Sequence, residues 1–214
     1  MGVDVDKEKV LGWVREERLS VAALLERLDD ADWEAPSLCR GWTVRDVAAH
    51  LTLSTRTTWP TMLKGVIRAR GNWERMEAEA AVRRAAAFSP AELIAQIRET
   101  AGSPKRAPMA SPLDPLVDFL VHGQDIARPL GLTRGMPPEQ TAAALGHVVS
   151  SPFYGARKRL RGVRLVATDL DWSTGDGPQE AQGPAADLLL LATGRPAGLT
   201  GVTGPGAERI AAAL

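Results

Sequence analysis

The sequence predicts an α+β fold, in which a four-helix bundle is followed by a small α+β unit. Four segments between residues 10 and 131 repeat apolar residues every three or four positions, as amphipathic helices do. The stretch 162–177 is instead rich in Val, Thr and Trp and contains an Asp-Gly turn signal, which favours strands. We place the boundary near 131–137, which predicts two domains, residues 1–133 and 134–214.

The first two helices are predicted from an apolar stripe and a start signal. Residues 10–28 carry the stripe, and a loop rich in Asp, Pro and Gly follows it. Thr43 and Asp46 have the spacing of a capping box, in which each side chain bonds the backbone N–H of the other residue. We expect the second helix to begin there and to continue into the 60s.

The segment after the second helix is less regular. Residues 65–88 are polar and rich in Ala, which predicts a connector with some helix. Ser89 as N-cap and Pro90 in the first turn then predict a third helix, which runs to about Thr100.

The C-terminal part mixes helix and strand signals. We predict a helix at 137–149, strands within 162–177, a short buried helix at 183–195, one more strand at 198–204 and a last helix at 206–214.

The charge and cysteine content narrow the class of protein. Lys+Arg and Asp+Glu are both 26, so the formal net charge is zero and no basic surface for nucleic acid is indicated. The single cysteine, Cys39, excludes an intramolecular disulfide and is typical of a reducing compartment. No run approaches the ~18 apolar residues of a membrane span, and the start MGVDVDKEKV shows no signal-peptide pattern. We expect a cytoplasmic monomer or homodimer with no nucleic-acid or membrane partner.

The fourth predicted helix contains an unusual polar strip. We expect Asp114 to cap its N-terminus and residues 129–131 to end it. Asp118, His122 and Asp125 are spaced four and three residues apart, so they lie on one face of a helix. Apolar residues flank this face on both sides, which predicts burial. Two carboxylates and an imidazole in such a helix are costly unless they pair with one another or bind a metal.

The second helix offers a matching histidine. Asp46 has a role as the last member of the capping box, but His50, four residues later, has none. Histidines on two antiparallel helices of a bundle can converge on a divalent ion in its core. Two imidazoles and one carboxylate, here His50, His122 and Asp118, would leave open positions as in catalytic zinc sites. Asp125 is then the residue that orients a ligating imidazole.

A simpler interpretation stays open at this point. A single histidine on a helix is more often a hydrogen-bonded or exposed residue than a ligand, and acid–histidine pairs four residues apart also stabilise ordinary helices. We assign His147 to packing for this reason. Cys39 has no companion cysteine and is assigned a structural role, and the tryptophans are assigned to packing: Trp33, Trp42 and Trp172.

Two blocks of the sequence resemble the mycothiol-dependent maleylpyruvate isomerase family. WEAPSLCRGWTVRDVAAHL, at 33–51, is similar to the N-terminal signature of that family, within the broader DinB-like superfamily. VHGQDIARPLG, at 121–131, is similar to its second block, and residues 167–195 are similar to its small C-terminal domain. The resemblance implies a DinB-like four-helix bundle followed by a sterol-carrier-like α+β domain.

The resemblance also implies a divalent metal, usually zinc, held by His50, Asp118 and His122. The family pattern has glutamate as its acid, whereas this chain has the shorter Asp118. Mycothiol or a similar thiol would be the cosubstrate, and a bound cation would hold it as the nucleophilic thiolate. The implied activity is isomerisation or thiol transfer on a small electrophilic substrate. The alternative is a non-enzymatic zinc-containing protein whose C-terminal domain holds a hydrophobic ligand or partner.

Overall fold

The computed structural model describes residues 6–214, whose backbone contacts divide into two compact units. One unit spans Asp6–Arg134 and the other includes Gly135–Leu214. Residues 1–5 lie outside the described residues. They belong to the predicted first domain and to the N-terminal stretch in which no signal-peptide pattern is expected. The α+β class is confirmed, and the assignment of two domains at 1–133 and 134–214 stays a prediction.

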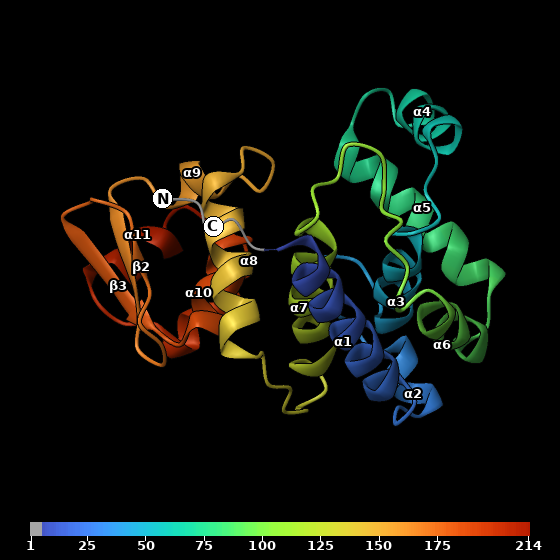
Figure 1. Ribbon diagram of the computed structural model, residues 1–214, viewed down its shortest axis with the longest axis horizontal. Helices are drawn as coiled ribbons and strands as arrows, with labels where there is room; N and C mark the ends of the chain where they lie inside the picture. Colours follow the sequence, from blue (N-terminus) through green and yellow to red (C-terminus); the bar gives the residue numbers. More distant parts are fainter. Residues whose placement is uncertain (1–5) are drawn as a thin grey trace. The chain divides into compact units, whose positions relative to one another are not determined.

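The first unit is entirely helical (Figure 1). Helices α1 and α3 each contact α6 and α7, and α5 packs against α3. The apolar periodicity predicts α1, α3, α6 and α7, and it does not mark α5. The helices of this unit are α1 (Lys7–Leu25), α2 (Asp30–Glu34), α3 (Val44–Leu53), α4 (Trp59–Arg68), α5 (Trp73–Ala87), α6 (Pro90–Glu99) and α7 (Asp114–Ala127).

The core of this unit lies between the facing apolar stripes of the four helices. Its largest side chains are fully buried, which explains why the period of three to four residues is so regular in the sequence. The central members are Val21, Leu25, Val47, Leu51, Leu93, Ile97, Phe119 and Ile126.

The prediction that the second helix continues into the 60s is wrong. Helix α3 ends at Leu53, and α4 begins at Trp59 with Thr58 as its N-cap. The cause is Pro60, which has no N–H to donate and whose ring would clash with the carbonyl four residues earlier in a continuous helix. The connector predicted at 65–88 is accordingly the end of α4 and the whole of α5.

The start of α7 also differs from the expectation. Asp114 is the first helical residue, and the N-cap position is taken by Leu113, without a side-chain cap. The Asp114 carboxylate instead accepts a hydrogen bond from the Ser111 backbone N–H at 2.6 Å, so it fixes the turn that precedes the helix.

The second unit is a small three-stranded sheet with helices. Strands β1 (Val163–Ala167) and β2 (Ser173–Thr174) are antiparallel, whereas β1 and β3 (Gln179–Gly183) are parallel, in the order β2-β1-β3. Leu165 pairs with Thr174 on one side and with Ala181 on the other. The helices are α8 (Pro138–Ser150), α9 (Ala156–Arg159), α10 (Ala185–Ala192), the 3-10 helix η1 (Pro196–Gly201) and α11 (Pro205–Ala211).

The strand predicted at 198–204 is wrong. Most of that segment is η1, and only Thr203 forms an isolated bridge, to Gln182. Gly198 and Gly201 explain the difference, because a Cβ at either position would lie within 2.4 Å of an oxygen of Asp187. The two glycines let the backbone pack directly against α10. A strand with side chains at these positions could not approach α10 so closely.

None of the helices among residues 6–214 is both long enough and apolar enough to cross a membrane.

Candidate metal centre

Helix α7 carries three of the predicted site residues on one strip. His122 and Asp125 are buried, Asp118 is half-buried, and the residues on either side of the strip are buried as well. The helix is therefore enclosed on both flanks, as its apolar residues predict. A polar strip in this setting must find its partners within the protein.

Helix α3 brings the fourth predicted residue to the same place. The Thr43 backbone N–H donates to Asp46 Oδ2 at 3.0 Å, and the Asp46 N–H donates to Thr43 Oγ1 at 3.2 Å, so the capping box fixes where α3 begins. His50 follows Asp46 by one turn and is half-buried. Its ring centroid lies 4.9 Å from that of His122, with the two rings at 71°.

His50, Asp118 and His122 thus come together from two helices. Each offers one ligand atom, and the three atoms all lie within 4.8 Å of one another. Two imidazole nitrogens and one carboxylate oxygen form a donor set that fits a divalent transition metal. Metal binding by these three residues stays a prediction, and the grouping of their donor atoms is the geometric condition it requires.

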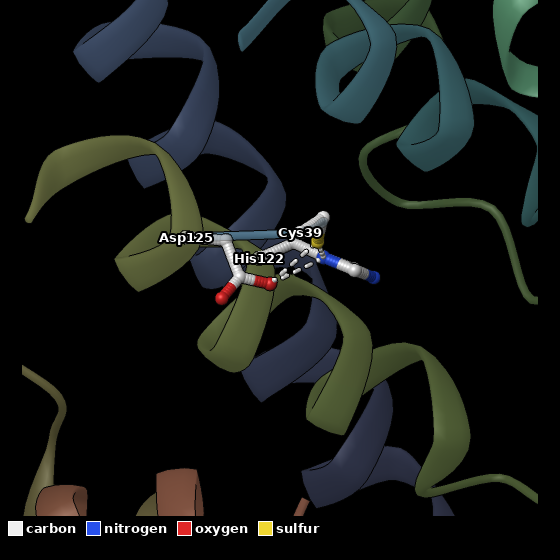
Figure 2. Close-up of side chains that lie close together, drawn as sticks. All are labelled: Cys39, His122 and Asp125. Atoms are coloured by element: carbon white, nitrogen blue, oxygen red, sulfur yellow. Dashed lines mark hydrogen bonds and ion pairs between the residues drawn. The ribbon is translucent and has the colours of Figure 1, made fainter. Parts of the chain in front are cut away.

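Asp125 contacts the His122 ring at Nδ1 (Figure 2). Its Oδ2 lies 2.8 Å from His122 Nδ1, and the Cys39 thiol donates to the same oxygen at 3.2 Å. Cys39 Sγ also lies 3.7 Å from His122 Nδ1. Cys39, His122 and Asp125 therefore form a second group with metal-ligand chemistry, which shares His122 with the first.

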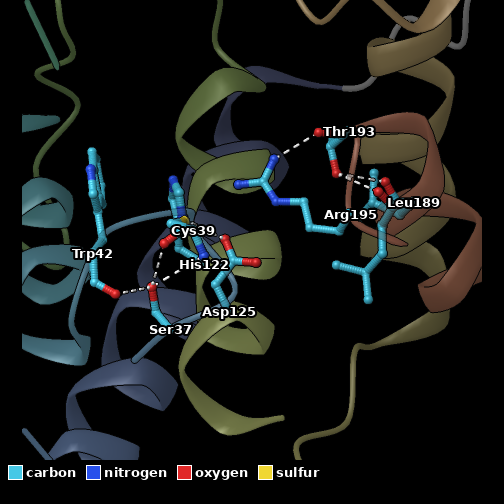
Figure 3. A network of polar contacts seen from close by, with 9 residues as sticks. Ser37, Cys39, Trp42, His122, Asp125, Leu189, Thr193 and Arg195 are labelled. Atoms are coloured by element: carbon cyan, nitrogen blue, oxygen red, sulfur yellow. Dashed lines mark hydrogen bonds and ion pairs between the residues drawn. The ribbon is translucent and has the colours of Figure 1, made fainter. Parts of the chain in front are cut away.

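The loop that contains Cys39 is held in place by hydrogen bonds of the Ser37 hydroxyl to its backbone (Figure 3). Ser37 Oγ donates to the Trp42 carbonyl at 2.9 Å and accepts from the Cys39 N–H at 3.1 Å. The Leu38 N–H donates to the Asp125 carbonyl at 3.1 Å, which joins the loop to α7. The sequence analysis assigns Cys39 a purely structural role and misses this contact, because nothing in the spacing connects positions 39 and 125.

Trp42 is a further neighbour of the site that the sequence analysis assigns to packing alone. Its ring centroid lies 5.3 Å from that of His50 and 6.5 Å from that of His122, to which it is nearly parallel at 16°. A signal was present in the sequence, since Trp42 immediately precedes the capping box whose helix carries His50. His147 lies elsewhere, on α8, where it contacts Tyr154 edge-to-face.

Comparison with known proteins identifies the helical unit. A family model described as the mycothiol maleylpyruvate isomerase N-terminal domain matches residues 14–118, a range that includes His50 and Asp118. Residues 14–118 belong to the mycothiol maleylpyruvate isomerase N-terminal domain family. No curated protein matches the chain.

Two solved structures extend this similarity to nearly the whole chain. A crystal structure of the mycothiol-dependent maleylpyruvate isomerase has a TM-score of 0.67 at 17% identity, covering 96% of this chain and 95% of that one. A mutant of that isomerase, with a histidine replaced by alanine, has a TM-score of 0.64 at 18% identity over the same shares of the two chains. At these identities the similarity establishes the fold.

On α7 of the helical unit, His122 has an unusual charge state. Burial lowers the pKa of His122, but the hydrogen bonds with Asp125 and Cys39 and the negative charge of Asp125 outweigh burial and raise the pKa to about 10. In the metal-free protein at neutral pH, the imidazole is therefore held as a cation paired with Asp125.

Two more charged residues of the domain interact with Asp118. Burial raises the pKa of Glu77, and the negative charge of Asp118 raises it further, while a hydrogen bond from Trp73 Nε1 at 3.0 Å opposes both. Burial lowers the pKa of Arg18 to about 10, and the charge of Asp118 partly offsets this. Glu77 was not among the predicted site residues, because residues 65–88 were predicted to be a connector with some helix.

Proposed function

We propose that this chain is a zinc-dependent enzyme that uses a low-molecular-weight thiol, of the mycothiol type, to isomerise a small electrophilic substrate or to transfer the thiol to it. The observation that supports this most directly is the grouping of donor atoms from His50, Asp118 and His122 within 4.8 Å. Three protein ligands of this kind leave coordination positions open to an exogenous ligand.

The residues present fit zinc. Asp125 engages Nδ1 of His122, so Nε2 is the nitrogen that remains as a donor toward His50 and Asp118. A carboxylate that holds the second nitrogen of a ligating histidine fixes its tautomer and orientation, and it raises the basicity of the imidazole. Asp125 has this arrangement, and the Cys39 thiol in turn supports Asp125 at 3.2 Å.

The surrounding residues supply the rest of the proposed chemistry. A zinc ion in this site would hold a bound thiol as thiolate, which is the nucleophilic form. Trp42 adds an aromatic ring beside the two histidines, with its centroid 5.3 Å from that of His50 and 6.5 Å from that of His122. Burial and the negative charge of Asp118 raise the pKa of Glu77, which brings this carboxyl toward the range useful for proton transfer beside Asp118.

A thiol-consumption assay tests the proposal. Zinc-loaded protein is mixed with mycothiol and a panel of small electrophiles, among them cis-configured unsaturated acids, and free thiol and substrate geometry are followed. We expect turnover that His50→Ala abolishes and that His147→Ala, a change at the histidine outside the cluster, leaves intact. If zinc-loaded protein consumes no thiol and converts none of the electrophiles, the enzymatic proposal is contradicted. That result would favour the alternative of a zinc-containing binding protein.

A further inference from the structure

Helix α4 exposes a strip of large apolar side chains that the proposed site does not use. Trp59, Leu63 and Ile67 are 62%, 60% and 69% exposed, and α4 buries none of its residues. Because they are spaced four residues apart, the three side chains lie along one line of the helix. Large contiguous apolar surface of this kind marks an interaction site on a folded protein.

The packing of α4 fixes which face is presented. Its principal contact is α5, and Gly65 forms the close approach, since a Cβ there would lie 2.8 Å from Cγ of Met76. At ~100° per residue, Leu63 lies about 160° around the helix from Gly65. The apolar strip therefore points away from the helix on which α4 rests, and Figure 1 shows α4 at the edge of the helical unit.

The charged residues of α4 and of the chain leading into it have a single sign. Residues 47–73 contain four Lys or Arg residues and no Asp or Glu, and the first acidic residue after them is Glu74 on α5. Three of the four, Lys64, Arg68 and Arg70, are exposed on α4 or directly after it. No ion pair joins these three to an acidic side chain in the described part of the chain, residues 6–214.

We propose that α4 docks on the surface of an anionic phospholipid bilayer. The strip of Trp59, Leu63 and Ile67 would enter the headgroup region, and Lys64 and Arg68 would contact lipid phosphates. An apolar face with a Trp and a cationic flank is the pattern of helices that lie in the membrane interface. Each exposed cation near an anionic leaflet adds electrostatic attraction.

The same features argue against a second copy of this chain as the occupant. Two α4 helices packed on each other would bring the same cations together without any acidic residue of 47–73 to neutralise them. The strip is also a single convex helix face, which a fluid surface can accommodate without a matching groove. The inference is independent of the proposed enzymatic function. It departs from the sequence-based expectation of no membrane partner, which depends on the lack of a spanning segment.

Vesicle cosedimentation with the full chain tests the inference. Vesicles of pure phosphatidylcholine are compared with vesicles of equal parts phosphatidylcholine and phosphatidylglycerol. We expect the protein to sediment with the anionic vesicles, with less binding as salt is raised, and to remain in the supernatant with the neutral ones. Absence of binding to the anionic vesicles at low salt would overturn the proposal.

Paired variants distinguish binding through the apolar strip and its cations from non-specific binding to vesicles. Leu63→Ser/Ile67→Ser and Lys64→Glu/Arg68→Glu should each lower the partition coefficient by about tenfold or more. Phe153→Ser removes an 81% exposed apolar side chain elsewhere, and Lys158→Glu/Arg161→Glu reverses two charges elsewhere; both should bind as wild type does. Circular dichroism verifies that every variant is folded. Equal binding by all four variants, or lipid-free dimerisation that only Leu63→Ser/Ile67→Ser abolishes, would contradict the membrane assignment.

Discussion

His122 and Asp125 form a buried hydrogen bond within α7, with Nδ1 and Oδ2 separated by 2.8 Å. The bond fixes the ring of His122 and leaves its other nitrogen for the cluster with His50 and Asp118. It also explains how a fully buried aspartate is tolerated in an apolar helix, since its charge has a partner. The proposed chemistry depends on this pair, and its consequences can be measured.

Removing the charge of Asp125 should weaken metal binding while the ligands stay in place. Asp125→Asn keeps the shape of the side chain but loses the charge-assisted hydrogen bond to His122, so we expect zinc affinity to fall by about 10–100-fold. Chelator competition measures the affinity. Asp176→Asn, at an exposed aspartate of the C-terminal unit, is the matched control and should bind zinc as wild type does. Equal affinity in both variants would remove Asp125 from the site.

The shorter acid at position 118 should act as a ligand. We expect Asp118→Asn to weaken zinc binding strongly, because an amide oxygen carries no negative charge. Asp118→Glu restores the acid type of the resembled family pattern and should retain bound zinc. Metal content by elemental analysis, together with circular dichroism, distinguishes loss of metal from loss of fold. Wild-type affinity in Asp118→Asn would show that position 118 does not ligate.

Cobalt substitution discriminates between the two groups that share His122. If His50, Asp118 and His122 hold the ion, Co²⁺-loaded protein has only nitrogen and oxygen ligands and lacks a sulfur-to-cobalt charge-transfer band in the near ultraviolet. Cys39→Ser should then keep full metal content. A charge-transfer band that disappears in Cys39→Ser would place the metal on Cys39, His122 and Asp125 instead. Such a band could come only from Cys39, because Cys39 is the sole cysteine of the chain.

The charge of His122 predicts how stability and metal binding depend on pH. The pKa of His122 is raised from its ordinary 6.5 to about 10 in the metal-free fold. The stabilisation it contributes is therefore fully present below about pH 6.5 and is lost as the pH rises through about 10. Urea denaturation of the metal-free protein between these limits measures the loss.

Zinc requires the neutral imidazole, so binding should displace the His122 proton. We expect zinc affinity to rise with pH between 7 and 9 by up to about tenfold per unit, with proton release on zinc addition in weakly buffered solution. His147→Ala should show the same dependence, because His147 lies outside the cluster. An affinity independent of pH would contradict the cationic state of His122.

The helical part of the fold was predictable because its signals are local. The apolar stripe of α1 and the capping box at Thr43 and Asp46 act within a few residues, and they mark the helix α1 and the start of α3. Pro60 was the signal overlooked, and it divides the second predicted helix in two. At 198–204, two glycines permit close packing on α10, a tertiary effect that no strand propensity encodes.

The candidate site was predictable only in part, for a related reason. Asp118, His122 and Asp125 share one helix, so their spacing is visible in the sequence, and His50 follows a recognisable helix start. Cys39 and Trp42 reach the site because a loop bonds to the backbone of α7 through the Leu38 N–H, and this contact spans 87 residues of sequence (from 38 to 125). Glu77 comes to Asp118 through the packing of α5, which composition alone had suggested was a connector.

Metal stoichiometry of the purified protein tests the central claim most directly. After zinc loading and exhaustive dialysis, we expect about one zinc per chain in wild type and in His147→Ala, and close to none in His50→Ala, which must be folded by circular dichroism. His50 is the decisive position because it lies on α3, half-buried, and forms no part of the His122–Asp125 pair. Zinc retained at wild-type level in folded His50→Ala, or absent from wild type under these conditions, would contradict the account.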